Sequence, residues 1–214
     1  MPRPTTHCLY AVIVSAAFGL LAGCGSSEPA LPKVRVLTEA EANARTVVPL
    51  TRTVALDKPG VIADFEFDVL PPPAYTGASL VIGVRLKEQD VKASIALNSM
   101  VAREGLPARV TLQRLKGSDA VDIELWGWSP LERHAVPLGR GGTAPWTEPA
   151  DINGQTLRAA GLLVPGTLYD VRSFASPGSP EPGKYRLRVE LLEARPSLRS
   201  AKAEIIVGYN TRAK

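Results

Sequence analysis

The stretch VIADFEFDV, residues 61–69, decides the fold, because apolar and charged side chains alternate along it with a period of two. One face of an extended chain carries the apolar side chains of Val61, Ala63, Phe65, Phe67 and Val69. The other face carries the carboxylates of Asp64, Glu66 and Asp68. Such alternation is typical of a half-buried antiparallel strand. We therefore expect Phe65 and Phe67 to lie in the core.

The same alternation recurs at intervals along the rest of the chain. It is found in residues 80–87 (with Arg85 and Lys87 outward), 108–112, 121–125 (with Asp122 and Glu124 outward), 185–191 and 205–209. Pro-Gly pairs at 59–60, 177–178 and 182–183 mark turns between these stretches. Several short strands separated by turns predict a mainly β protein, an antiparallel β-sandwich.

Two segments have helical signals, and one has little pattern. Apolar side chains in residues 90–104 follow helical spacing, with Asp90 as N-cap and Gly105 at the end, which predicts one helix crossing between strands. Thr38 and Glu41 fit a capping box that opens a short helix to about Arg45. Residues 129–166 are rich in Gly and Pro, and we interpret them as a long loop insertion. A loop of this length is more often functional or partly folded than idle.

The N-terminus has the features of a bacterial lipoprotein. A short polar start with Arg3 precedes an apolar run over residues 9–21, which suits a signal peptide and is too short to span a bilayer. The run ends in LAGC, residues 21–24, which resembles the lipobox cleaved by the lipoprotein signal peptidase. We therefore predict a signal peptide at 1–23 and a lipid on the thiol of Cys24.

The predicted lipid anchor also predicts a location. Two or three acyl chains make such an anchor effectively permanent, whereas a single chain binds reversibly. The residue after Cys24 is Gly25 rather than Asp, which by resemblance to enterobacterial sorting rules favours the periplasmic face of the outer membrane over the inner membrane. We expect residues 24–45 to form a lipidated tether with the short helix, and residues 46–214 to form a single sandwich domain.

Composition after export excludes several functions. His7 and Cys8 leave with the signal peptide, and Cys24 carries the lipid, so that His134 is the one remaining histidine and no thiol is left. A disulfide and a Cys/His metal site are therefore not expected. The whole chain has a net charge of only +4, without a basic block, and this gives no electrostatic case for nucleic acid.

The sequence offers little catalytic chemistry, and we expect neither an enzyme nor a cofactor. His134 is the side chain whose charge changes near neutral pH, but it lies in a Pro-rich loop, where a histidine is usually only surface. No Gly-x-Ser-x-Gly motif surrounds a serine. Asp64, Glu66 and Asp68 lie on a face predicted to be solvated. The glycine-rich residues 139–142 lack the lysine and the helix of a phosphate loop.

The tryptophans are the candidate binding residues. If Leu125 faces the core, Trp126 and Trp128 project from the opposite face and form a flat apolar platform, with Trp146 in the adjoining insertion. Tryptophan gives a large contact area at low entropic cost, so that the platform suits a protein-binding or sugar-stacking surface. The alternative is that the insertion folds over the platform and buries it as a second small core.

The C-terminal third resembles a family of uncharacterised proteobacterial lipoproteins. The similar segments are PGKYRLRVEL (182–191), PSL (196–198) and AEIIVGY (203–209), together with the Pro59-Gly60 turn and the strand to Val69. The resemblance covers about half of the chain after the signal peptide. It implies an immunoglobulin-like sandwich and genes near type VI secretion effectors, whose producers need periplasmic immunity proteins. The family supplies no catalytic residues, and the insertion at 129–166 departs from it.

Two classes of function follow from these observations. The first is a lipid-anchored binding protein, an immunity protein that neutralises a toxic effector in the periplasm. The second is a structural or assembly lipoprotein of an envelope machine. A hydrolase is disfavoured, because the sequence lacks a nucleophile and a base. In both remaining classes the expected partners are a membrane, through the lipid on Cys24, and a protein.

Overall fold

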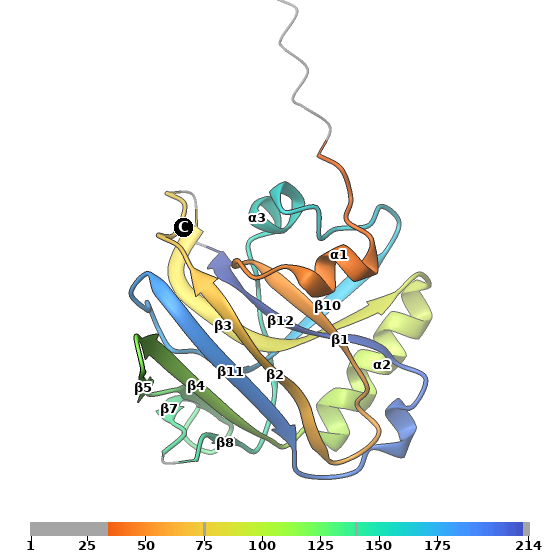
Figure 1. Ribbon diagram of the computed structural model, residues 1–214. Helices are drawn as coiled ribbons and strands as arrows, with labels where there is room; N and C mark the ends of the chain where they lie inside the picture. The colour runs from red at the N-terminus through yellow and green to blue at the C-terminus, as the bar shows by residue number, and fades with distance from the viewer. Residues whose placement is uncertain (1–33, 75, 140, 212–214) are drawn as a thin grey trace, which may run out of the picture. The chain divides into compact units, whose positions relative to one another are not determined.

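The computed structural model describes residues 34–74, 76–139 and 141–211 (Figure 1). The predicted signal peptide, Cys24 and the tether up to residue 33 lie outside the described residues. From Val34 onward the chain forms one compact unit. No helix in the described part is long and apolar enough to cross a membrane.

Two antiparallel sheets form the body of the protein. Sheet A contains, in spatial order, β2 (Gly60–Val69), β11 (Gly183–Leu191), β4 (Ala108–Lys116) and β5 (Asp119–Asp122), with β8 (Thr143–Ala144) also paired to β4. Sheet B contains β1 (Leu50–Val54), β12 (Lys202–Thr211), β3 (Thr76–Glu88), β10 (Leu168–Ala175) and β9 (Glu148–Pro149). This arrangement confirms the predicted mainly β antiparallel sandwich. The immunoglobulin-like assignment stays a prediction.

The main core lies between the sheets and follows the predicted alternation. Phe67 and Tyr185 are opposite each other on β2 and β11, with ring centroids 6.0 Å apart, and both are buried. Sheet B contributes the inward side chains of Leu80, Ile82, Val84, Ile205 and Val207. Burial of each large apolar side chain contributes about 1.5–3 kcal/mol, so the two facing rows supply much of the stability.

The helices begin where their capping residues predict. The Thr38 hydroxyl and the Glu41 carboxylate form the capping box of α1 (Glu39–Ala44). Asp90 caps α2 (Val91–Glu104), which crosses from sheet B to sheet A and ends at Gly105. Both predicted helices are therefore confirmed. A 3-10 turn, η1 (Pro196–Leu198), connects β11 with β12.

The insertion is more ordered than a loop. It contains β7 (His134–Pro137), β8, β9 and α3 (Gly154–Ala159). Leu157 of α3 and Leu162 after it join Val81 and Ile206 in a second apolar cluster on the outer face of sheet B. The insertion is thus partly folded, and part of it folds over the outer face of sheet B.

The N-terminal segment is attached to the same side of the molecule. The amide of Leu37 donates to the carbonyl oxygen of Gly161 at 2.9 Å. The guanidinium of Arg52 donates to the carbonyl oxygens of Ala42 and Arg45, which lie at the end of α1. Residues 34–45 therefore form part of the cover over sheet B.

Some predicted orientations are wrong. Val61 is 46% exposed, next to a register shift in the pairing of β2 with β11, where Glu190 lies opposite Val61 and Val189 opposite Ala63. Phe65 is only half-buried, and Arg52 stacks on its ring. Arg85 lies on the outer face of β3, but the cover over sheet B buries it. The predicted strand at 121–125 is broken, since β5 ends at Asp122 and the next strand begins at Trp126.

Candidate functional site

Trp126 and Trp128 lie on one face of β6 (Trp126–Ser129) and are exposed. Their exposed fractions are 40% and 41%, whereas Gly127 between them is buried. The platform predicted from the sequence therefore exists, and the insertion does not bury it. Instead, β7 pairs with β6 edge to edge, with Pro137 opposite Trp126 and Ala135 opposite Trp128.

The β6–β7 hairpin is fixed to the sandwich at its base. The amide of Trp126 donates to the carbonyl oxygen of Ser176 at 2.9 Å, and the amide of Ser176 donates back to Trp126 at 2.8 Å. A Cβ on Gly127 would lie 2.5 Å from Cδ2 of Leu138 and 3.3 Å from the Phe174 oxygen, so a larger residue would have to displace the Leu138 side chain. The hairpin thus holds the two indoles on a defined backbone.

The tip of the hairpin carries one more apolar side chain. Leu131 is 95% exposed, at the turn between β6 and β7. His134 begins β7 and is exposed, and its Nε2 lies 3.1 Å from a carboxylate oxygen of Glu132. Ser129 lies opposite His134 in the hairpin, and its hydroxyl accepts the amide of Glu132 at 3.2 Å. We define the aromatic hairpin as Trp126, Trp128 and Leu131 on β6–β7.

Trp146 is not part of the aromatic hairpin and follows it in the sequence. It is 47% exposed, between β8 and β9, and its ring packs over Gly105 at the end of α2, with Cε3 3.5 Å from a Cβ built there. The structure therefore places two of the three predicted tryptophans on one strand face and the third on a different connection.

A cleft of about 700 Å³ lies next to the base of the aromatic hairpin. It is bordered by the edge of β4, by the segment that leads into β6, and by the glycine-rich turn of the insertion. The described lining residues are Val110, Thr111, Leu112, Asp122, Ile123, Glu124, Leu125, Gly139, Gly141 and Gly142. Its size is within the usual range for ligand sites, about 300–1,000 Å³.

This cleft was not predicted from the sequence. The glycines at 139–142 are the one local signal in the sequence that relates to it. No local pattern in the sequence indicates that the turn at 139–142 packs against β4. A Cβ on Gly142 would lie 1.8 Å from the carbonyl oxygen of Val110, and the φ of Gly142 is +57°, so glycine is required there on two grounds.

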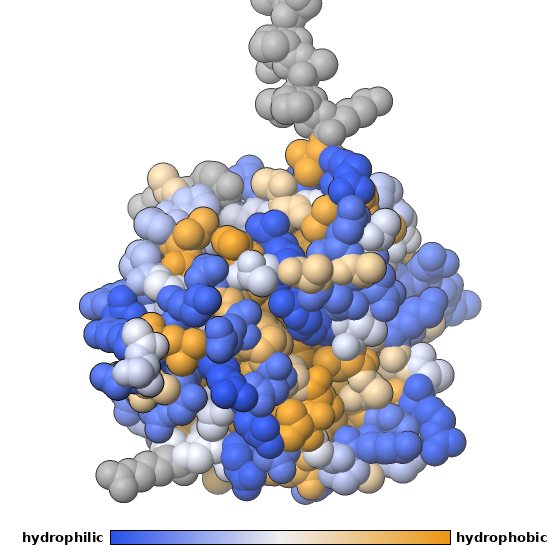
Figure 2. Space-filling model, viewed as in Figure 1, coloured by the Kyte–Doolittle hydropathy of each residue, from blue (hydrophilic) through white to orange (hydrophobic). Residues whose placement is uncertain are grey.

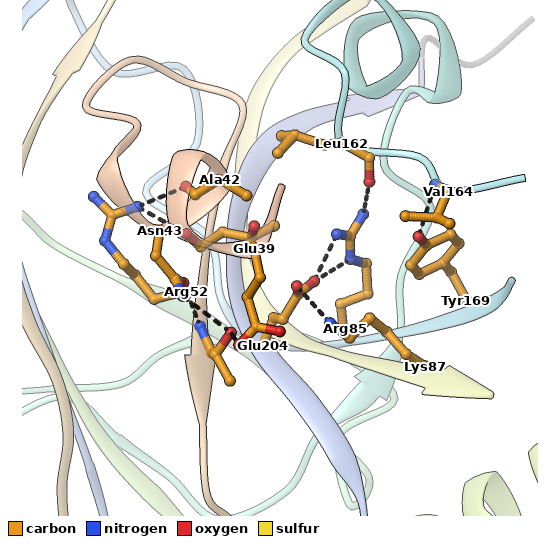
Figure 3. A network of polar contacts seen from close by, with 12 residues as sticks. Glu39, Ala42, Asn43, Arg52, Arg85, Lys87, Leu162, Val164, Tyr169 and Glu204 are labelled. Atoms are coloured by element: carbon orange, nitrogen blue, oxygen red, sulfur yellow. Dashed lines mark hydrogen bonds and ion pairs between the residues drawn. The ribbon is translucent and has the colours of Figure 1, made fainter. Parts of the chain in front are cut away.

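Sheet B carries a buried network of charged and polar side chains (Figure 3). Nη2 of Arg85 lies 2.6 Å from Oε2 of Glu204, and Nζ of Lys87 lies 2.8 Å from Oε1 of the same carboxylate. Nη1 of Arg85 donates to the carbonyl oxygen of Leu162 at 3.0 Å, and the guanidinium stacks on Tyr169 at 4.3 Å from the ring centroid.

The network holds the cover in place. Because Arg85 bonds both to Glu204 on β12 and to the backbone at Leu162, it attaches the insertion to the sheet. The hydroxyl of Tyr169 accepts the amide of Val164 at 3.0 Å, which fixes the same segment a second time. The cavity beside these residues measures about 150 Å³. Both carboxylate oxygens of Glu204 already accept hydrogen bonds from the cationic side chains of Arg85 and Lys87. We therefore assign a stabilising role to the network.

Metal binding finds no support in the described part of the chain, where no three His, Cys, Asp or Glu side chains are grouped to hold an ion. The described geometry thus defines a class: a β-sandwich that presents an aromatic hairpin and an adjacent cleft. Exposed aromatic side chains beside a cleft suit contact with another molecule.

Comparison with known proteins adds little to this class. No family model matches the sequence, and no curated protein matches it either. The crystal structure of a protein from Sulfurospirillum deleyianum is similar at 14% identity, with a TM-score of 0.45. The similarity covers 77% of this chain and 98% of that one.

Proposed function

We propose that this chain is a lipid-anchored, periplasm-facing binding protein that engages a protein partner through the aromatic hairpin. One observation carries the proposal: Trp126 and Trp128 are two-fifths exposed on a hairpin whose backbone is fixed, with Leu131 almost fully exposed at its tip. Large apolar side chains on a pre-ordered backbone are typical of the central residues of protein interfaces, since little entropy is lost on binding.

The position of the hairpin in the fold supports a protein partner. In Figure 1, α1, near which the described chain begins, and β7 lie at opposite ends of the view. The aromatic hairpin is therefore remote from the end of the described chain that would lead to Cys24. The partner class that we propose, from the resemblance of the C-terminal third, is a toxic secreted enzyme that the protein neutralises.

The binding test uses the full-length protein and its captured partner. After affinity purification from periplasm and mass spectrometry of the retained protein, Trp126→Ala and Trp128→Ala are each measured for partner affinity and for melting temperature. Loss of a central tryptophan at an interface commonly costs about 2 kcal/mol, so that each variant should bind roughly thirty-fold more weakly with an unchanged melting temperature.

Trp146→Ala is the matched control, because it removes an indole of similar exposure away from the aromatic hairpin. Full affinity in both hairpin variants would remove the hairpin from the interface. If the tryptophan variants have a lower melting temperature, the partner affinity of Leu131→Asp becomes the test of the interface. The Leu131 side chain is 95% exposed, so its replacement removes almost no packing from the folded protein. Retained affinity in Leu131→Asp would then contradict the proposal.

The anchor is tested separately. Cys24→Ser should abolish incorporation of labelled palmitate and leave uncleaved precursor in the inner membrane, because the thiol is the nucleophile that takes the diacylglycerol. Incorporation at the level of the unchanged protein would contradict the lipoprotein assignment, whatever the result of the binding test.

A further inference from the structure

The loop between β2 and β3 is apolar and exposed. Its residues 70–74 have the sequence LPPPA, which contains no polar side chain. Leu70 is 52% exposed, and Pro71 and Pro72 beside it are exposed as well. Turns between strands usually carry Gly, Asn, Asp or Ser, so a connection with apolar side chains alone is unusual. We define residues 70–73 as the proline loop.

The main chain of the proline loop has few free hydrogen-bonding groups. Three of its four residues are prolines, which have no N–H. The carbonyl oxygen of Leu70 accepts the hydroxyl of Tyr209. The carbonyl oxygen of Pro73 accepts the amide and the hydroxyl of Thr76, at 2.9 and 2.8 Å. Unpaired main-chain groups are what makes it costly to move a loop from water into lipid, and the proline loop avoids most of this cost.

The apolar surface continues from the proline loop toward the beginning of the described chain. Leu70 and Pro73 line a groove of about 290 Å³ together with Leu37 and Ala160. Figure 1 shows the end of β2 at the same end of the molecule as α1 and α3. Val34, where the described chain begins, is itself 48% exposed. The proline loop therefore lies at the end of the domain that leads to Cys24.

The predicted lipid anchor keeps this end of the domain within reach of a bilayer. Cys24 is ten residues before Val34, and ten residues span at most about 35 Å. A short tether makes a second contact with the bilayer an intramolecular event, with an effective concentration in the millimolar range. An apolar contact that is too weak to hold a free protein on lipid is therefore populated in the anchored protein.

We propose that the proline loop docks on the lipid surface to which the chain is anchored, with the side chains of Leu70, Pro71 and Pro72 among the lipid headgroups. This inference rests on the proposed lipid anchor and deepens it, because it identifies the end of the domain that faces the bilayer. The strand β7 of the aromatic hairpin lies at the other end of Figure 1. Docking of the proline loop therefore directs the aromatic hairpin away from the membrane, toward a partner in the periplasm.

The test compares a fluorescent dye at two sites of similar exposure, in the full chain after export and lipidation by the cell. Because no thiol is expected after export, Leu70→Cys and Val121→Cys each provide one thiol for an environment-sensitive dye. Leu70 is 52% exposed, and Val121 on β5 is 50% exposed.

Each labelled protein is reconstituted into phosphatidylcholine vesicles, with and without lipids that carry a nitroxide on the acyl chain. The dye at position 70 should shift its emission to the blue, because it leaves water for the interface of the bilayer. It should also be quenched several-fold more strongly by the nitroxide than the dye at position 121. The dye at position 121 should keep the emission that it has in water.

A second reporter measures the contribution of Leu70 without a dye at that position. In Pro72→Cys the dye should also shift to the blue, and the shift should disappear when Leu70→Asp is added, because a charged side chain resists entry into lipid. Equal emission at positions 70 and 121, or a signal at position 72 that Leu70→Asp does not change, overturns the proposal.

Flotation of the vesicles separates failure of the docking from failure of the anchor. A protein that floats with the vesicles while its dye at position 70 stays in water keeps the anchor and rejects the docking. A protein that does not float rejects the anchor, and the docking with it. Neither measurement uses the indoles, so the binding test of the aromatic hairpin stands apart from both.

Discussion

The outer faces of the two sheets arise from the same sequence pattern but have opposite environments. On sheet A, Asp64 forms exposed ion pairs with Arg186 and Arg188, at 2.8 and 3.2 Å. On sheet B, Arg85 and Glu204 form a pair at 2.6 Å whose side chains are only 3% and 6% exposed. Figure 2 shows mostly hydrophilic side chains over β11 and β4, on the face that remains in solvent.

This difference teaches that alternation identifies the faces of a strand but not what lies over them. Charged residues at every second position occur in both sheets. Their surroundings differ because α1, α3 and the segment around Leu162 cover the outer face of sheet B. The energetic consequence is large, because an exposed ion pair contributes about 0–1 kcal/mol, whereas removing one member of a buried pair costs about 3–5 kcal/mol.

The largest effect is expected for Glu204→Gln. Loss of this carboxylate charge leaves the buried Arg85 and the half-buried Lys87 without their counter-ion, and the free energy of unfolding should fall by about 3–5 kcal/mol. Urea denaturation followed by circular dichroism measures this change. Asp64→Asn on sheet A is the matched control and should cost less than about 1 kcal/mol. Equal losses would show that the cover does not shield the network from water.

A smaller effect is expected for the apolar part of the cover. Leu157 of α3 is buried in the second cluster, and Leu157→Ala should lower the free energy of unfolding by about 2–3 kcal/mol. Val121→Ala, on the exposed strand β5 of sheet A, should change it by no more than about 0.5 kcal/mol. A neutral Leu157→Ala would mean that α3 contributes no stability where it lies.

The smallest expected effect is the change of stability with pH. This change has one sign for Asp64 on sheet A and the opposite sign for Asp170 on sheet B. Arg186 holds the pKa of Asp64 below its ordinary value of 3.8, so the stabilisation from Asp64 is present above that value and is lost as the pH falls through the folded pKa. Burial raises the pKa of Asp170 on β10, whose Oδ2 lacks a hydrogen-bond partner in the described structure. Its contribution is therefore favourable at low pH and is lost as the pH rises through the folded pKa.

Asparagine at each position separates these two contributions. Asp64→Asn should flatten the loss of stability in acid, whereas Asp170→Asn should make the protein more stable at neutral pH. Denaturation midpoints measured between about pH 3 and about pH 7 follow both slopes. A decrease in neutral-pH stability for Asp170→Asn would show that the carboxylate is stabilised by a partner.

The sandwich could be predicted because its core depends on local alternation. Phe67, Tyr185 and Leu187 lie inward as their spacing requires, and Thr38 and Asp90 cap helices through bonds to residues only three positions away. The burial of Arg85 could not be predicted in this way. It depends on the carbonyl oxygen of Leu162, which is 77 residues away in the sequence.

The candidate site was predictable to the same extent. The exposure of Trp126 and Trp128 follows from their spacing relative to the buried Leu125, and the structure confirms it. The cleft does not follow from any local pattern, because it exists only where β5 and β8 stop short of each other along β4. Strand pairing between distant segments determines that gap.

The attachment of residues 34–45 to sheet B has a mechanical consequence. A force that pulls on Val34 first loads the hydrogen bond between Leu37 and Gly161, and then the bonds that Arg52 makes to the end of α1. These contacts would rupture one after another, before any strand of the sandwich is loaded. Residues 34–45 would therefore detach and extend under tension while the aromatic hairpin stays folded.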